Sequence, residues 1–492
     1  MITGQGEPTS PVNRQLDGLA EDEFRMRRLV PEDAIGVRED RGRFRLAVLA
    51  CLGHRVGRPR PSKTGLDQSD GVRTDGKDSR HGHQAVIVEP VKTAGGRNHI
   101  TRHDILSTIV RLSSLDALRG FIMIIMALGH TREFFHWGAM SFSPEYLSRV
   151  TPLLFFTRWI THLCAPVVMF TAGAAAFLWL ERGHTKAQLS RFLWKRGLWL
   201  ALLELTAFRF AISFSLTTGP FLRSVLWALG LSMIVLAALI HLPHHLPLRV
   251  LTVVSIATIA LHHFADAWRP ESVLWSGLHR LAVIPFGGVT VITAYPLIPW
   301  FAVMALGFCF CFGSIMKNEP AARQQITLRL GLATTAAFIG LRWLNIYGDP
   351  SPWTSGVLSF LRTNKYPPSL HYLLMTLGLA LILFSWLDRR ERALPNPLIV
   401  FGRVPLFFFY CIFYVLHLLT YPFALFKYGE ASFALLASPA MGGNAAAYPP
   451  PYGYDLLATY GIWIGLVIGS YPICLWFARW KARDRAWWLI YL

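Results

Sequence analysis

Apolar segments of about 20 residues recur from residue 111 onward, separated by polar loops. Each is long enough to cross a hydrocarbon core of roughly 30 Å as an α-helix. The pattern predicts ten spans, at residues 114–134, 152–180, 193–215, 222–241, 248–264, 296–316, 326–346, 368–387, 397–426 and 456–478. We therefore expect an all-α, polytopic membrane domain over residues 111–492, in which Pro166 and Pro405 tilt or break the long second and ninth spans.

The first 110 residues have a different pattern. They hold 18 Lys and Arg and 15 Asp and Glu, but only two aromatic residues, Phe24 and Phe44. Such a segment buries too little apolar surface to offset its chain entropy. The sequence thus predicts a disordered N-terminal extension over residues 1–110, and a mis-assigned start codon is an open alternative for this segment.

The net charge of +19, from 48 Lys and Arg against 29 Asp and Glu, raises nucleic acid as a partner. The placement of the basic residues argues against that. Sixteen lie in short loops at 182–196, 249, 317–329, 389–392 and 479–485, whereas the alternate loops, although longer, hold seven. Cytoplasmic loops retain excess positive charge. We expect a membrane protein with both termini cytoplasmic and no nucleic-acid partner.

Ionisable side chains at membrane depth are costly and are candidates for function. In the first span, Asp116 and Arg119 precede His130 on nearly the same helix face, because eleven residues at 100° each leave a net rotation of about 20°. The axial separation of Arg119 and His130 is about 16 Å. This geometry is typical of an anion-binding entrance with a base at its far end, although an interfacial salt pair is an equally good interpretation of Asp116 and Arg119.

Other ionisable residues lie in or beside the spans. Histidine titrates near neutral pH and is a candidate base wherever it is accessible, yet a single helix-packing histidine is common. These further candidates are His136, Arg158, His162, Glu204, Arg209, Arg342, Arg403 and His417. The pair His262–His263 lies at a span end and is interpreted as interfacial. Cys309 and Cys311 fall on nearly opposite helix faces, so no metal site is predicted.

Several strings together resemble the heparan-α-glucosaminide N-acetyltransferase catalytic-domain family of membrane acyltransferases. The opening Leu115-Asp116-Ala-Leu-Arg119-Gly120 leads into an apolar helix, and the Arg119-to-His130 spacing also resembles that of membrane enzymes that O-acylate envelope sugars. Further similar strings are Trp159-Ile-Thr-His162-Leu-Cys-Ala-Pro166, Tyr295-Pro-Leu-Ile-Pro-Trp300, Lys365-Tyr-Pro-Pro-Ser369 and Phe401-Gly-Arg403-Val-Pro405. The similarity covers nearly all of residues 111–492, looks closest to bacterial members of the family, and implies a location in the bacterial inner membrane.

The resemblance implies transfer of an acetyl group from cytosolic acetyl-CoA to an amine or hydroxyl of an extracytoplasmic glycan or glycolipid. It implies a histidine base, for which His130 and His136 are alternatives, with His162 as a further catalytic candidate. Cations at a cytoplasmic entrance would hold the phosphates of coenzyme A, and Asp116, Arg119 and Arg403 are the candidate residues there. Lys365 to Ser369 either shapes the acceptor mouth or simply starts a helix.

A secondary transporter is the alternative from another class, since buried charges and broken helices also line solute pathways. The second five spans contain no repeat of the Asp116–Arg119–His130 pattern, which disfavours an inverted-repeat transporter. A third hypothesis is a non-catalytic protein that moves or senses an envelope lipid. A homodimer is compatible with the sequence, but the sequence does not determine the oligomeric state or the acceptor. It also does not distinguish a mechanism with an acetyl-enzyme intermediate from direct transfer of the acetyl group.

Overall fold

The computed structural model describes residues 112–140, 146–214, 221–241, 248–268, 272–286, 289–311, 313, 318–430, 453–484, 486 and 489. The predicted N-terminal extension, residues 1–110, lies outside these described residues. The rest is mainly helical, as expected for an all-α fold.

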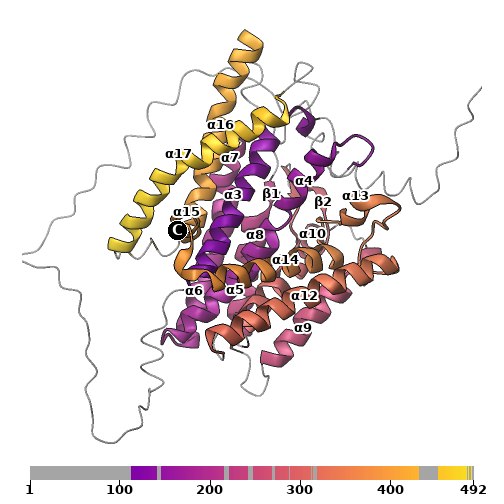
Figure 1. Ribbon diagram of the computed structural model, residues 1–492, viewed down its shortest axis with the longest axis vertical. Coiled ribbons are helices and arrows are strands. Elements are labelled where there is room, and N and C mark those ends of the chain that lie inside the picture. The colour runs from indigo at the N-terminus through magenta and orange to yellow at the C-terminus, as the bar shows by residue number, and fades with distance from the viewer. Residues whose placement is uncertain are drawn as a thin grey trace, which may run out of the picture. The chain divides into compact units, whose positions relative to one another are not determined.

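The α-helices follow one another along the chain as labelled in Figure 1. They are α3 (Ser113–Phe135), α4 (Pro152–Thr161), α5 (Cys164–Glu181), α6 (Lys186–Leu203), α7 (Arg209–Ser213), α8 (Val225–Leu239), α9 (Leu248–Leu261), α10 (Val273–Leu278), α11 (Leu297–Phe310), α12 (Pro320–Leu344), α13 (Gly356–Leu361), α14 (Leu370–Arg389), α15 (Asn396–Arg403), α16 (Pro405–Tyr428) and α17 (Leu456–Arg483). Short 3-10 turns are η2 (Trp137–Met140), η4 (His262–Ala267) and η6 (Glu391–Ala393), and η3 (Glu204–Phe208) is a π-helical turn.

The helices coincide with the predicted apolar segments, but ten spans are not confirmed. Within the described residues, six helical segments are long and apolar enough to cross a membrane: 113–135, 152–181, 248–266, 370–389, 405–428 and 456–483. The helices α8 and α11 are apolar but shorter. Several Lys and Arg interrupt the apolar character of α6 and α12.

The long second segment is interrupted at His162 and Leu163, not at Pro166 as the sequence predicts. Pro166 lies in the first turn of α5, where a backbone N–H has no intrahelical partner to lose. The expectation for Pro405 is confirmed, because α15 ends at Arg403 and Pro405 opens α16.

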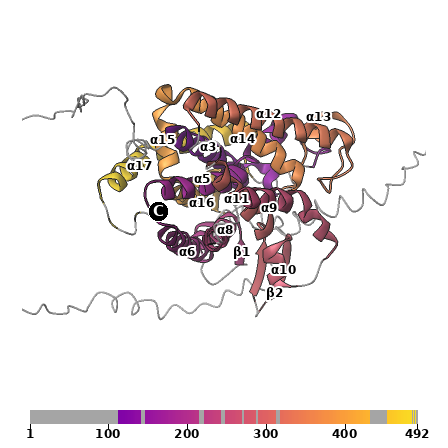
Figure 2. The same ribbon diagram turned by 90° about the horizontal axis from the view of Figure 1, so that it is seen from below.

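Glycines allow several helix pairs to approach closely. A Cβ atom on Gly120 would overlap the carbonyl oxygen of Leu398, and one on Gly402 would overlap that of Asp116, so α3 and α15 cross with their backbones in contact. Gly173 and Gly307 play the same part between α5 and α11. Small residues at such crossings are typical of helix packing in membranes. The helices α12 and α14 also lie side by side (Figure 2).

A small sheet is the remaining regular element. Strand β3 (Val289–Thr293) lies between β1 (Phe221–Arg223) and β2 (Ala282–Phe286). It pairs parallel with β1, Leu222 opposite Ile292, and antiparallel with β2, Val283 opposite Ile292. Ala294 and Tyr295 donate backbone hydrogen bonds to the Arg223 carbonyl, so the sheet fixes the entry to α11.

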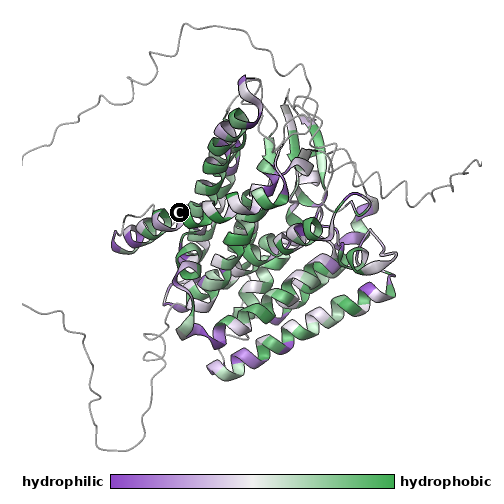
Figure 3. Ribbon diagram, turned by 45° about the horizontal axis from the view of Figure 1, so that its top comes forward, coloured by the Kyte–Doolittle hydropathy of each residue, from purple (hydrophilic) through white to green (hydrophobic). Residues whose placement is uncertain are grey.

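Hydrophobic residues predominate along the helices, as Figure 3 shows. Many of them are not covered by protein. Only 17% of the apolar window of residues 248–266 and 22% of that of α17 is buried. Exposed residues such as Val253, Ile256 and Ile468 would be unfavourable in water, whereas lipid accommodates them. The exposed apolar surfaces thus support an integral membrane protein.

Candidate functional site

The amino end of α3 carries one carboxylate between two arginines. The Asp116 Oδ1 atom lies 3.7 Å from Nη1 of Arg119, and Oδ2 lies 3.7 Å from Nε of Arg403 on α15. Asp116 is buried, while the Arg403 side chain is 47% exposed. The three residues that the sequence analysis assigned to coenzyme A are therefore together, and they leave accessible positive charge beside the helix crossing.

Arg119 is held in place from a second side. Its Nη2 atom donates to the carbonyl oxygen of Thr171 on α5, at 2.5 Å. Thr171 also lines a small apolar hollow between α3, α5, α11 and α14. Farther along α3, Met123 and Met126 are buried in the hydrophobic core. The α3 face between Arg119 and His130 is therefore lined by buried apolar side chains.

The carboxyl end of α3 carries a second charged group, centred on Glu133. Nδ1 of His130 lies 2.8 Å from Oε2 of Glu133, one helical turn away. The other oxygen, Oε1, lies 3.6 Å from Nη2 of Arg132 and 3.8 Å from Nη1 of Arg158 on α4. Two cations beside a buried carboxylate favour its ionised form.

This arrangement sets the tautomer of His130. An ionised carboxylate only accepts hydrogen bonds, so Nδ1 of His130 carries the hydrogen and Nε2 keeps its lone pair. The His130 side chain is 22% exposed, and its ring packs on Phe413 with centroids 4.4 Å apart. A histidine that a carboxylate orients through one nitrogen, with the other nitrogen open, has the geometry of a general base.

In His136 the roles of the two ring nitrogens are the reverse of those in His130. The backbone N–H of Gly138 donates to Nδ1 of His136 at 3.0 Å, so Nε2 carries the hydrogen. The ring is buried, and its position is fixed by backbone hydrogen bonds that join Phe135 and Trp137 to Tyr454. Burial lowers the pKa of His136 to about 4, with the positive charge of Arg132 contributing and Asp455 opposing. His136 is thus suited to donate a hydrogen bond rather than to take a proton.

The low pKa of His136 predicts an acid-sensitive step in stability. The unfolded histidine, with a pKa near 6.5, takes a proton at a higher pH than the folded one does. Stability is therefore fully present above about pH 6.5 and falls by up to about 3 kcal/mol as the pH drops toward 4. Thermal unfolding in detergent at pH 7 and pH 4.5 should show a smaller acid loss for His136→Asn than for the wild type. The same loss in both proteins would contradict the burial of a neutral His136; His184→Asn, at an exposed position, is the control.

His162 lies at the junction of α4 and α5, one turn after Arg158. It is buried; the Tyr372 hydroxyl donates to its carbonyl oxygen at 2.8 Å, and the two rings meet edge to face 5.4 Å apart. These contacts join α14 to the α4–α5 junction. They give His162 a packing role next to the Glu133 group.

Two of the other candidates stabilise helix ends and packing. Glu204 accepts hydrogen bonds from the backbone N–H groups of Ser224 and Leu226 and from the Ser224 hydroxyl, and so caps α8. On α16, Nδ1 of His417 contacts the Ala211 carbonyl oxygen at 2.9 Å, and its ring stacks on Phe214. The charges that appear anomalous in the sequence thus have structural partners.

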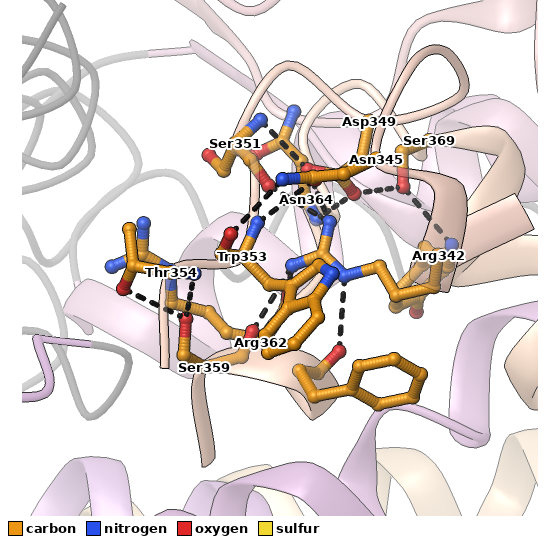
Figure 4. Close-up of polar contacts among 12 residues, drawn as sticks. Arg342, Asn345, Asp349, Ser351, Trp353, Thr354, Ser359, Arg362, Asn364 and Ser369 are labelled. Carbon is orange, nitrogen blue, oxygen red and sulfur yellow. Dashed lines mark hydrogen bonds and ion pairs between the residues drawn. The ribbon is translucent and has the colours of Figure 1, made fainter. Parts of the chain in front are cut away.

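Arginines 209 and 342 also have structural contacts. Arg209 lies over the Phe221 ring at 4.3 Å. Figure 4 shows the guanidinium of Arg342 among backbone carbonyls: it donates to Ser351, Ser359, Phe360 and Arg362 and lies 3.9 Å from Asp349. Asp349 in turn accepts from Ser351, Asn364 and Ser369. Arg342 therefore organises the loop between α12 and α14.

The string Lys365 to Ser369 leads directly into a helix, which is one of the two interpretations of its sequence. The Ser369 hydroxyl accepts the backbone N–H of Tyr372 and caps α14. Just before it, Lys365 is buried, with its ammonium 5.0 Å from the Tyr366 ring centre and 5.9 Å from that of Tyr295.

The sequence analysis did not single out Glu133 or Asp388. Glu133 follows His130 by three residues, a spacing that brings side chains together on a helix and would have indicated the pair. Asp388 of α14 binds Arg323 of α12 through both carboxylate oxygens and accepts the Ser114 hydroxyl at 2.9 Å. No local spacing links residues so far apart in the chain, so this pair required the fold.

A bundle of apolar helices with ionised groups at both ends of a buried span is typical of an integral membrane protein. Residues 111–348 match the family model described as heparan-alpha-glucosaminide N-acetyltransferase, catalytic, so this region is similar to that family. The resemblance found in the sequence is thus confirmed, and the family implies a membrane acyltransferase. The match contains Asp116, Arg119 and all three histidine candidates but ends before Arg403. Among curated proteins, none gives a significant match to the chain.

Proposed function

We propose that this protein transfers an acetyl group from acetyl-CoA to an amine or hydroxyl of an extracytoplasmic sugar or glycolipid, with His130 as the general base. The observation that carries the proposal is the His130–Glu133 pair, 2.8 Å apart, at the carboxyl end of a buried helix. Glu133 orients the imidazole, and Nε2 is left to accept a proton from the attacking group.

His130, the acceptor and acetyl-CoA account for every bond and proton in the proposed reaction. His130 takes a proton from the acceptor amine or hydroxyl, whose nitrogen or oxygen then bonds to the acetyl carbonyl carbon. The carbon–sulfur bond of the thioester breaks, and the coenzyme A thiolate takes the proton back from His130. Glu133 stabilises the imidazolium between the two proton transfers. An acetyl-histidine intermediate at Nε2 is an alternative route with the same residues.

We assign the donor to the opposite end of α3. The phosphates of coenzyme A need accessible cations, and the half-exposed Arg403 next to Arg119 supplies them. Asp116 would keep the two guanidinium groups apart and oriented. Apolar side chains around Thr171, whose carbonyl oxygen Arg119 contacts, would line the path of the less polar thioester arm. If both termini are cytoplasmic, this end faces cytosolic acetyl-CoA, and the His130 end faces the acceptor.

Turnover in proteoliposomes tests the function. The purified chain should release free coenzyme A from acetyl-CoA and label an amino sugar or envelope glycan supplied on the other side of the membrane. A folded protein that neither binds nor consumes acetyl-CoA, yet takes up a solute, would contradict the proposal and favour the transporter.

Arg403 provides a separate test of the donor site. We expect Arg403→Ala to raise KM for acetyl-CoA about tenfold to a hundredfold, because charge-assisted contacts contribute about 1.5–3 kcal/mol. The value of kcat should change much less, since Arg403 lies far from His130 along α3. Arg483→Ala removes an exposed arginine at the end of α17 and should behave like the wild type. An unchanged KM in Arg403→Ala would place the donor elsewhere.

A further inference from the structure

Three histidines and an aspartate gather where α9 ends. His262, His263 and Asp266 lie on the turn η4, and His279 follows α10. Nδ1 of His263 is 2.7 Å from Oδ2 of Asp266, and Nε2 of His279 is 3.0 Å from Oδ1 of the same carboxylate. The rings of His262 and His263 are 4.1 Å apart. This cluster is separate from the His130–Glu133 pair and from the Asp116 group, and neither proposed role uses it.

The hydrogen bonds determine which nitrogen of each ring is available. Nε2 of His262 lies 3.1 Å from the Pro368 carbonyl oxygen, which can only accept, so Nε2 carries the hydrogen and Nδ1 has a lone pair. His263 and His279 each donate to the Asp266 carboxylate, which leaves a lone pair on Nε2 of His263 and on Nδ1 of His279. All three of these remaining nitrogens are buried and have no hydrogen-bond partner among the described residues.

Buried nitrogens without partners are unfavourable, and most buried polar atoms in folded proteins find one. Two of the three nitrogens, Nδ1 of His262 and Nε2 of His263, belong to residues that lie beside the Asp266 carboxylate, so a ligand bound there would satisfy both. Each nitrogen offers a lone pair, so its partner is either a hydrogen-bond donor such as water or an electron-pair acceptor such as a metal ion. One ligand atom from each of His262, His263 and Asp266 already lies within 4.8 Å of the others. Binding one ion at all three residues would require the His263 ring to turn, because its Nδ1 contacts Asp266 while its Nε2 lies on the other side of the ring.

We propose that His262, His263 and Asp266 bind a divalent transition-metal ion, with Zn²⁺ the best match. Two imidazole nitrogens and one carboxylate oxygen are a ligand set that Zn²⁺ accepts, and they leave a fourth position for water or a further donor. His279 acts as a positioning residue, since its hydrogen bond to Oδ1 orients the Asp266 carboxylate. The carbonyl of Pro368 has the same role toward His262. Asp266, with 35% of its side chain exposed, marks the side from which the ion enters.

The ion would connect segments that are distant in the chain. Through His262 and Pro368 it links the end of α9 to the turn before α14, and through His279 it links α10 to the same point. A further hydrogen bond joins the loop after α12 to α9, because the Tyr347 hydroxyl donates to the Ala260 carbonyl oxygen. The site is therefore structural in character and does not depend on the proposed acetyl transfer.

Metal binding to the full chain tests this inference without any acyl donor or acceptor. The protein, purified in detergent with a histidine-free affinity tag, is stripped with EDTA and titrated with Zn²⁺ alone. Bound zinc is measured by mass spectrometry after gel filtration, and Co²⁺ replaces Zn²⁺ to report coordination by its visible absorption. We expect about one Zn²⁺ per chain and intense absorption bands typical of a four-coordinate Co²⁺ site.

The variants separate ligands from other histidines. His262→Ala/His263→Ala should lose the bound zinc and the cobalt bands, and Asp266→Asn should weaken zinc binding at least tenfold. His279→Gln should bind zinc about 10- to 100-fold more weakly with unchanged stoichiometry, as expected for a residue that orients a ligand. His241→Ala, at an exposed position, is the control. If the double variant does not fold, His263→Asn replaces it.

Two results would overturn the inference. The first is a wild-type chain that takes up no zinc at micromolar concentrations. The second is zinc binding in the folded double variant, or in His263→Asn, equal to that of the wild type.

Discussion

His130→Ala is expected to lower kcat for acetyl transfer by about 10² to 10⁴, the usual contribution of a positioned general base. Acetyl-CoA should still bind with nearly unchanged affinity, because the proposed donor site lies about 16 Å away along α3. Steady-state release of coenzyme A gives kcat, and calorimetric titration with acetyl-CoA gives the affinity. His184→Ala is the matched control at an exposed position.

The comparison with His136 makes this prediction specific. Since Nδ1 of His136 accepts the Gly138 N–H, His136→Asn retains an acceptor there and should keep most of the activity. Glu133→Gln should lower kcat less than His130→Ala does, by about 10- to 100-fold, because the amide can still accept from Nδ1 but does not stabilise the imidazolium. If His136→Asn abolishes turnover while His130→Ala retains it, the assignment of the base is wrong.

The spacing of residues along the sequence was sufficient to predict some contacts of the candidate site. The period of a helix puts Asp116, Arg119 and His130 on one face, and the structure shows the Asp116–Arg119 contact. The same rule, applied to residues 130 and 133, would have found Glu133. Apolar segments predicted helix positions well, because burial in lipid or protein demands a continuous hydrophobic run.

The remaining contacts of the candidate site depend on the tertiary fold and could not be predicted from the sequence. Arg403 contacts Asp116 only because two glycines let α15 cross α3, and nothing in the sequence near either residue indicates that crossing. Glu204, Arg342 and His417 are ionisable residues that the sequence marks as candidates, yet the fold supplies each with backbone partners. His263 and Asp266 have the same three-residue spacing as His130 and Glu133, whereas His279 after α10 reaches Asp266 only in the folded chain. Hydropathy alone therefore identifies costly residues without distinguishing structural roles from chemical ones.

The close crossing of α3 and α15 leads to the second large expected effect. In Gly402→Ala, the new methyl group would overlap the Asp116 carbonyl oxygen and backbone atoms of α3, which cannot move aside as a flexible side chain can. Overpacking typically costs 1–3 kcal/mol, and a clash with backbone should reach about 3 kcal/mol or more. Separating the helices would also draw Arg403 away from Asp116, so weaker acetyl-CoA binding should accompany the lower stability.

Gly465 of α17 provides the matched control. It is exposed, and no atom lies within 4 Å of the position that its Cβ would take. Gly465→Ala should therefore be neutral or should stabilise the helix by up to about 1 kcal/mol, the difference in helix propensity between glycine and alanine. Thermal unfolding of both variants in the same detergent compares the two sites directly. Equal unfolding temperatures for Gly402→Ala and Gly465→Ala would show that α3 and α15 are not in backbone contact, and the link between this crossing and the arginine pair at Asp116 would then fail.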